Sequence, residues 1–190
     1  MASLNTSMTV AEASALLDVD EKAIRKEIEH GILVSRTREP VEVSFFELVY
    51  LAVTLELGLH LGVEDRRAIH DVVLESLGRT PRVAHVKLSP ILDLHLGSVF
   101  DDVAARVSRF EAWKSTRVVE DPNVLAGEPT FKGTRVPVRK VGEMLRTHGK
   151  AAESEIAEDY PALTKEDLEF ALRFVRAYPR RGRPREASPR

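Results

Sequence analysis

A short polar segment near the N-terminus carries side chains that could bind nucleic acid. Three basic residues and one acidic residue occur there at i, i+3, i+4 and i+7 spacing: Lys22, Arg25, Lys26 and Glu29. This spacing places them on one face of a helix that we predict over residues 21–30, with Ile24 and Ile28 facing inward. Lysine and arginine contact DNA phosphates and base edges, and such a helix can enter the major groove. A solvated helix face fits equally well, because residues 1–43 contain five basic against eight acidic side chains.

Two helix starts and a tight turn must position this face. Thr9 and Glu12 form a predicted capping box, in which the two side chains satisfy free backbone donors at the start of a first helix. Asp20 is the predicted N-cap of the second helix. Between the two helices, Asp18-Val19-Asp20 interrupts the apolar pattern. The sequence therefore predicts a short helix, a tight turn and a second short helix that ends at Gly31.

An alternating segment follows the second helix. Residues 34–43 read VSRTREPVEV, with Arg36 and Arg38 beside Pro40, and this pattern predicts a short hairpin or wing. We expect the two arginines to contact phosphates while the helix faces the groove. The predicted DNA-binding residues are therefore Lys22, Arg25, Lys26, Arg36 and Arg38.

This N-terminal pattern resembles a known class of DNA-binding module. Residues 11–33, AEASALLDVDEKAIRKEIEHGIL, are similar to the N-terminal winged helix-turn-helix of MerR-type and excisionase-type proteins. The sequence departs from their pattern at Leu17-Asp18-Val19, where the usual turn contains a glycine. The resemblance therefore implies that Asp18 makes the turn, although aspartate adopts left-handed geometry less easily than glycine. The resemblance implies binding to operator DNA, and we expect the chain to bind as a homodimer.

The next segment predicts two helices. Residues 44–57 begin with a capping box at Ser44 and Glu47 and are apolar on most faces, so we expect them in the core or, less commonly, in a dimer interface. A second helix is predicted over about residues 64–77. It is expected to turn four apolar side chains inward and two arginines outward: Ile69, Val72, Val73 and Leu77 against Arg66 and Arg67.

Residues 80–97 break the helical pattern and alternate with period two, which predicts one or two strands. A helix over about residues 99–113 follows. Asp93 and His95 fall on one face of a predicted strand and have the chemistry of metal ligands, but no third ligand is near them in the sequence. We therefore expect no metal, no cofactor and no catalytic residue, and we predict that the protein is not an enzyme.

The segment 117–178 is dense in glycine and proline and then predicts three helices. Its motifs occur in order as Asp121-Pro122, Gly127-Glu-Pro129, Gly133-Thr-Arg135-Val-Pro-Val138, Tyr160-Pro-Ala-Leu-Thr164 and Glu166-Asp167. On these motifs the segment closely resembles the domain-of-unknown-function family 433. The resemblance implies a homeodomain-like three-helix module of VapB-type antitoxins, which are commonly paired with a PIN-like ribonuclease toxin.

The residues predict the same three helices. The first helix starts at Pro137-Val138 and ends at Gly149, the second covers about residues 152–159, and Thr164 caps the third. Four residues are expected on the buried face of the third helix: Leu168, Ala171, Leu172 and Val175. The preceding loop GEPTFKGTR is no phosphate cradle, because it lacks the Gly-Lys-Ser/Thr ending; we expect Arg135 to pair with a carboxylate such as Asp121.

The C-terminal eleven residues, RRGRPREASPR, hold five arginines and one glutamate and should be disordered when alone. One hypothesis is that four of them enter the acidic active site of the toxin: Arg180, Arg181, Arg183 and Arg185. The alternatives are an A·T-rich minor groove, because Arg-Gly-Arg-Pro is similar to an AT-hook core, or a solubilising end without a partner.

Composition limits the class of protein. Of the 190 residues, 43% are hydrophobic and 31% are charged, which is typical of a soluble globular chain. The chain has no cysteine, so disulfides and thiolate chemistry are excluded. We find no apolar run long enough to cross a membrane and no signal sequence, and we expect a cytoplasmic protein.

The sequence predicts a mainly α fold with short β strands (α+β). Four segments are expected: 1–79, a winged helix-turn-helix with following helices; 80–116, a strand–helix connection; 117–179, the family-433 module; and 180–190, a basic tail. The predicted function is that of an antitoxin that binds a cognate PIN-like ribonuclease toxin and represses its own operon by binding operator DNA. The alternative is a stand-alone MerR-like transcription regulator whose apolar middle helices line a ligand pocket.

Overall fold

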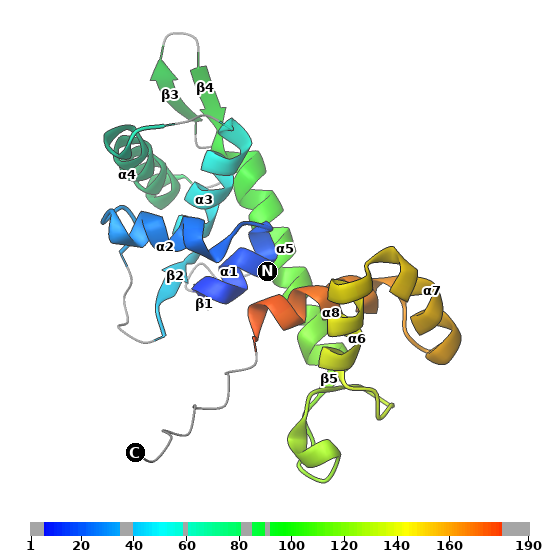
Figure 1. Cartoon of the computed structure of the whole chain (residues 1–190). Helices are drawn as coiled ribbons and strands as arrows, with labels where there is room; N and C mark the ends of the chain where they lie inside the picture. The colour runs from blue at the N-terminus through cyan, green and yellow to red at the C-terminus, as the bar shows by residue number, and fades with distance from the viewer. Residues whose placement is uncertain (1–5, 35–39, 59–60, 81–84, 90–91, 180–190) are drawn as a thin grey trace, which may run out of the picture.

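The computed structural model of the chain describes residues 6–34, 40–58, 61–80, 85–89 and 92–179. This part is mainly helical with short antiparallel strand pairs (Figure 1), which confirms the predicted fold class. Its α-helices are α1 (Val10–Leu17), α2 (Glu21–Glu29), α3 (Phe45–Leu57), α4 (Val63–Arg79), α5 (Leu96–Arg117), α6 (Val138–His148), α7 (Lys150–Asp159) and α8 (Lys165–Ala177). The strand pairs are β1 (Ser7–Thr9) with β2 (Glu42–Ser44), β3 (His85–Ser89) with β4 (Leu92–His95), and β5 (Val118–Val119) with β6 (Thr130–Phe131). None of the described helices combines the length and the apolar character that crossing a bilayer requires.

Local contacts form the predicted α1–turn–α2 unit. The Glu12 carboxylate accepts a hydrogen bond from the Thr9 backbone N at 2.9 Å, and Thr9 Oγ1 accepts from the Glu12 backbone N at 3.3 Å. Asp18 takes the left-handed conformation in the turn, with φ of 58°. Asp20 Oδ1 accepts from the Lys22 backbone N at 2.9 Å and begins α2. The capping and turn predictions for this unit are confirmed.

The strand at residues 42–44 pairs with the strand at the N-terminus. The sequence predicts a hairpin or wing within residues 34–43, of which 35–39 lie outside the described residues, and β2 pairs with β1, with Met8 opposite Val43. Both of these side chains are buried, so the pairing covers the base of α1 with apolar atoms. Alternation in a sequence indicates a strand but not the strand that pairs with it. Arg36 and Arg38 lie outside the described residues.

α3 is a core helix. Leu48, Val49 and Tyr50 are fully buried, and the helix packs against α4 and α5. Phe45 meets Phe100 of α5 edge to face, with ring centroids 5.2 Å apart. Of the two expectations for this apolar segment, burial within the chain is therefore the one that the structure supports.

α4 departs from the prediction at two positions. Ile69, Val73 and Leu77 are buried as expected, at i, i+4 and i+8 spacing. Val72 lies beside this narrow stripe and is 40% exposed, so its predicted inward position is wrong. Arg66, predicted to face solvent, instead reaches α2 and is 20% exposed. Periodicity defines the apolar stripe, but it does not show which long polar side chains a neighbouring helix will take up.

α5 extends beyond its predicted ends and connects the two halves of the molecule (Figure 1). Its N-terminal part packs against α3, and its C-terminal part packs against α8. α8 in turn contacts both α6 and α1, so a segment near the C-terminus lies against the first helix of the chain. The buried apolar cluster is therefore continuous from the N-terminal helices to the C-terminal ones.

The buried face of α8 is wider and more aromatic than predicted. Ala171 and Val175 are buried as expected, whereas Leu168 and Leu172 are only half-buried. The largest buried side chains are instead two aromatic ones, Phe170 and Phe174, both packed on Trp113 of α5. The prediction assumed a single partner face, but α8 lies between α6 on one side and α5 and α1 on another.

α6 and α8 approach each other most closely at Gly142. A Cβ at this position would lie 2.3 Å from the backbone O of Ala171 and 2.6 Å from Val175 Cγ1. Alanine adds about 1 kcal/mol of helix propensity over glycine, but a clash with backbone is relieved only by moving the helices apart. We expect Gly142→Ala to lower the free energy of unfolding by about 1–3 kcal/mol, as overpacking of a core usually does.

The measurement is urea denaturation of Gly142→Ala beside Gly78→Ala. Gly78 lies in α4, where an added Cβ meets no atom within 4 Å, so this control should be neutral or stabilising. If both variants were equally stable, the close packing of α6 on α8 would be contradicted.

Candidate nucleic-acid interface

The three predicted DNA-binding residues of α2 share an exposed face. Lys22, Arg25 and Lys26 are all exposed, as the helical spacing predicts. Arg25 Nη2 lies 3.5 Å from Glu21 Oε2, a loose ion pair on the helix surface. Within the described residues the ammonium groups of Lys22 and Lys26 have no ion pair. These cations are therefore open to an anionic partner.

The opposite face of α2 is held by a polar cluster that periodicity did not predict. Glu27 is 9% exposed and accepts hydrogen bonds from the Tyr50 hydroxyl at 3.2 Å and from Arg66 Nη1. Arg66 Nη2 lies 3.2 Å from His30 Nδ1, and Arg67 donates to the His30 backbone O at 2.9 Å. Helices α3 and α4 thus fix both the rotation and the C-terminal end of α2.

This cluster has a titration consequence and one signal in the sequence. Burial raises the pKa of the Tyr50 hydroxyl well above its usual range, and the neighbouring Glu27 carboxylate adds to the rise. Tyr50 therefore stays a neutral hydrogen-bond donor to Glu27 even at alkaline pH, where an exposed tyrosine loses its proton. The sequence signal was Glu27 itself, which falls three residues after the buried Ile24 and so belongs to the inward face.

An open hollow of about 900 Å³ lies beside the N-terminal end of α2. Its walls come from α2, α6 and α8, and Lys22, Arg25, Arg146 and Arg176 are among the residues that line it. Arg176 Nη1 of α8 donates to Asp18 Oδ1 in the α1–α2 turn at 2.6 Å. This hydrogen bond and the charge of Arg176 lower the pKa of Asp18. The C-terminal half therefore contacts the turn that positions α2.

A second contact joins the same helices. The Tyr178 hydroxyl, just after α8, donates to Glu12 Oε1 in the first turn of α1 at 2.6 Å. Lys114 Nζ of α5 donates to the same hydroxyl oxygen at 2.8 Å. Burial, followed by the hydrogen bond to Glu12, raises the pKa of Tyr178. Together with the Asp18–Arg176 pair, this contact fixes α1 against α8.

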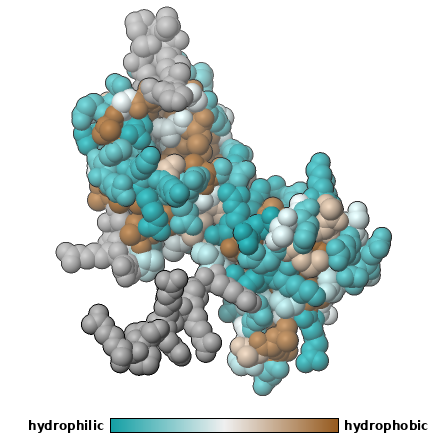
Figure 2. Space-filling model, viewed as in Figure 1, coloured by the Kyte–Doolittle hydropathy of each residue, from teal (hydrophilic) through white to brown (hydrophobic). Residues whose placement is uncertain are grey.

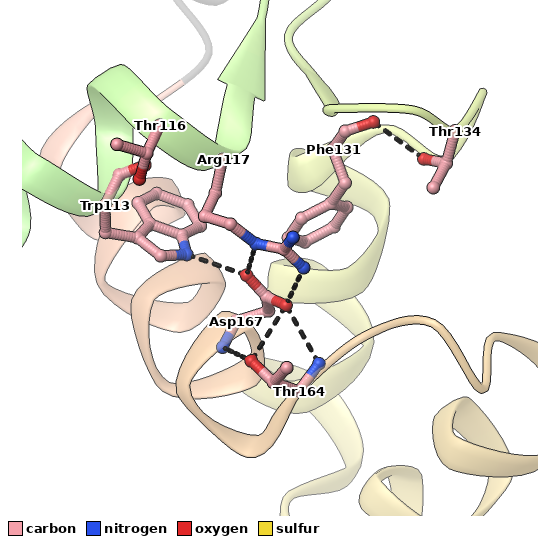
Figure 3. Close-up of polar contacts among 7 residues, drawn as sticks. All are labelled: Trp113, Thr116, Arg117, Phe131, Thr134, Thr164 and Asp167. Atoms are coloured by element: carbon pink, nitrogen blue, oxygen red, sulfur yellow. Dashed lines mark hydrogen bonds and ion pairs between the residues drawn. The ribbon is translucent and has the colours of Figure 1, made fainter.

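Asp167 anchors α8 to α5 (Figure 3). One of its carboxylate oxygens accepts from Trp113 Nε1 at 3.0 Å and from Arg117 Nε at 2.8 Å. The other accepts from Arg117 Nη2 and from the backbone N and hydroxyl of Thr164, at 2.8 and 2.9 Å, as the capping box of α8. The Asp167 side chain is 1% exposed. Burial alone would raise its pKa, but the bonds from Arg117, Thr164 and Trp113 outweigh burial and hold the pKa well below its usual range.

The loop between β5 and β6 presents an apolar tip. Figure 2 shows a hydrophobic patch at this end of the molecule. Leu125 of the loop is 50% exposed, and Val119 of the adjoining β5 is 38% exposed. Leu125 and Ala126 have φ of 49° and 56°, a left-handed backbone that costs a non-glycine residue roughly 1–2 kcal/mol. Exposed apolar surface on a strained loop is typical of a site that a protein partner covers.

The other predicted site residues either lie outside the described residues or do not form the predicted contacts. Arg180, Arg181, Arg183 and Arg185 lie outside the described residues. The predicted Arg135–Asp121 pair is absent from the described part of the chain; Asp121 Oδ1 instead accepts from the backbone and side-chain nitrogens of Asn123. Asp93 and His95 lie on β4, and the described ranges contain no group of three His, Asp or Glu residues suited to hold a metal ion.

Residues 118–175 match the family described as "Protein of unknown function (DUF433)". The C-terminal segment, hereafter the DUF433 segment, is thus similar to that family. The match confirms the resemblance that the glycine- and proline-rich motifs indicated, and it runs from β5 into α8. Trp113 and Arg117, which hold Asp167 of the DUF433 segment, lie just before the matched range. No curated protein and no solved structure matches the chain.

Proposed function

We propose that the chain is the DNA-binding antitoxin of a toxin–antitoxin pair. In this proposal α1 and α2 are the helix-turn-helix of a winged, MerR-like module that binds operator DNA as a homodimer. The DUF433 segment and the tail hold a PIN-like ribonuclease toxin. The observation that carries the DNA-binding part is the exposed cationic face of α2, held from behind by Glu27, Tyr50 and Arg66.

A recognition helix needs side chains long enough to contact the bases, and it must be held in a fixed orientation. Side chains within hydrogen-bonding range discriminate bases only if the helix that carries them is held in register, and phosphate contacts set that register. On α2, the long side chains are those of Lys22, Arg25 and Lys26. The buried polar cluster behind them fixes the orientation of the helix. Arg36 and Arg38 are proposed to contact phosphates beside them.

Support for the toxin-binding part comes from the family resemblance and from charge. The active site of a PIN-like nuclease is a cluster of metal-binding carboxylates, and the arginines of residues 180–190 complement it. The apolar tip at Leu125 is the described surface of the DUF433 segment best suited to a protein partner.

The toxin-binding part is tested by co-expression with the protein encoded by the adjacent reading frame. We expect the full chain to relieve growth arrest and to co-purify with that protein. Deleting residues 180–190 is expected to weaken toxin affinity by at least roughly tenfold, because it removes several charge-assisted hydrogen bonds. A matched control replaces only Glu186, Ala187, Ser188 and Pro189 with a Gly-Ser stretch and keeps the arginines.

Unchanged affinity after the deletion would remove the tail from the mechanism. Failure of the full chain to bind or neutralise the neighbouring protein would contradict the antitoxin proposal itself.

A ligand-sensing regulator is supported less well. The apolar side chains of α3 that were expected to line its pocket are packed in the core. The hollow between α3 and the β4–α5 junction has a volume of about 240 Å³, below the roughly 300–1,000 Å³ of typical ligand sites.

A further inference from the structure

The DUF433 segment contains a strongly basic stretch. Residues 130–150 hold six lysine or arginine side chains and one acidic residue, Glu143. By contrast, residues 18–29, which include the turn and α2, hold three basic and five acidic side chains. Phosphate neutralisation supplies most of the affinity of a protein for DNA. The basic side chains of α2 can therefore contact base edges in a groove. Because its segment carries more acidic than basic side chains, α2 supplies little of this electrostatic attraction alone.

Three of the six cations of the basic stretch, Arg139, Lys140 and Arg146, lie on α6. A hollow of about 580 Å³ follows this helix and is lined by Arg139, Lys140, Arg146 and His148, among others. Lys140 is exposed, and the Arg146 side chain is 61% exposed. Lys140 Nζ donates to the Tyr160 hydroxyl, and Arg146 pairs with Glu143, both at the surface of the helix. Surface contacts of this kind are weak, so a DNA phosphate could replace them at little cost in free energy.

The hollow along α6 adjoins the hollow beside α2. Glu143 and Arg146 line both of them, and Lys22 and Arg25 line the second. α8 lies against α1 on one side and α6 on the other, so the chain holds these surfaces in a fixed relation (Figure 1). Basic side chains thus extend from α2, past Arg146, to Lys140, and acidic side chains lie among them in the hollow beside α2: Asp18, Asp20, Glu21 and Glu143.

We infer that the DUF433 segment is part of the DNA-binding surface and that Lys140 and Arg146 contact the phosphates that flank the groove occupied by α2. This inference rests on the proposed binding of DNA by α2. In this inference the two halves of the chain have different roles. α2 contacts base edges, and the cations of α6 contact the DNA backbone. The Asp18–Arg176 contact then supports DNA binding, because it holds α6 and α8 in place beside α2.

The test is a fluorescence-anisotropy titration of the full chain with a 30-base-pair mixed-sequence duplex, about 30 being enough for three helical turns, at several salt concentrations. The variant is Lys140→Ala with Arg146→Ala. Its matched control is Arg79→Ala with Arg109→Ala, which removes the same charge from exposed positions outside both hollows. Thermal denaturation of each protein verifies that it is folded.

We expect the α6 variant to bind the duplex at least about tenfold more weakly at low salt, with the slope of log K against log salt reduced by about 2, one unit for each lost phosphate contact. The control should change neither quantity by a comparable amount. Wild-type affinity and slope in the α6 variant, in a chain whose binding depends on α2, would overturn the inference alone. A wild-type chain that binds no duplex would overturn both the inference and the proposed DNA binding.

Discussion

Asp167→Ala is expected to lower the free energy of unfolding by about 2–4 kcal/mol. The change removes the N-cap partner of α8, a loss of about 1 kcal/mol, and leaves the buried Trp113 N–H without an acceptor, a cost of about 1–3 kcal/mol. Loss of the ion pair with Arg117 adds less to the destabilisation than loss of a buried ion pair usually would. The Arg117 side chain is 37% exposed and can turn toward water. For a chain of this length, the melting temperature should fall by roughly 5–15 °C.

The matched control is the neighbouring carboxylate. Glu166 is 57% exposed and pairs with Arg109 at 3.3 Å, so Glu166→Ala should cost less than about 1 kcal/mol. Equal effects of the two substitutions, by thermal or urea denaturation, would contradict the role of Asp167 as the anchor between α5 and α8.

Acid provides an independent measurement of the same contact. The pKa of Asp167 is lower in the folded chain than its ordinary value of 3.8. A depressed carboxyl pKa stabilises the fold above the unfolded-state pKa and loses this stabilisation as the pH falls toward the folded-state value. Asp167→Asn should therefore remove part of the decline in melting temperature below about pH 4, where the unfolded-state carboxyl takes up its proton.

Replacing Lys22, Arg25 and Lys26 together with alanine is expected to have the largest effect on DNA binding. The three side chains are exposed and their loss opens no cavity, so the fold should be retained. Loss of two or three phosphate or base contacts should weaken binding by at least about a hundredfold at low salt and reduce the salt slope by roughly 2 to 3.

The control for this triple variant removes three exposed cations elsewhere: Arg79, Arg109 and Lys165, each replaced by alanine. Anisotropy titration of both variants separates a specific surface from a general effect of net charge. Equal losses in the two variants would mean that α2 has no special place in binding.

The parts of the structure that the sequence predicted are those encoded locally. The capping boxes at Thr9 and Ser44 and the left-handed turn at Asp18 depend on residues only a few positions apart, and all three occur in the structure. The exposed face of α2 follows from helical spacing in the same way. The motifs that indicated DUF433 are also local, because tight turns need glycine and proline at fixed positions.

The contacts that local patterns could not predict join distant residues. Arg66 lies 39 residues from Glu27, and Arg117 lies 50 residues from Asp167. Arg176 is 158 residues from its partner in the α1–α2 turn. No spacing rule relates such positions, and Arg66, which helical periodicity assigns to solvent, instead holds α4 against α2. The Asp18–Arg176 contact holds α6 and α8 beside α2, and because no local pattern predicts it, Lys140 and Arg146 of α6 did not enter the predicted site.

The most direct test of the account is the affinity of the purified wild-type chain for the DNA upstream of its own gene. Fluorescence anisotropy would compare this duplex with a duplex of equal length and shuffled sequence, across a range of salt concentrations. The account predicts tighter binding to the upstream duplex, with log K falling against log salt at a slope of roughly −3 or steeper. Absence of binding to both duplexes at about 50 mM salt, where phosphate contacts are strongest, would contradict it.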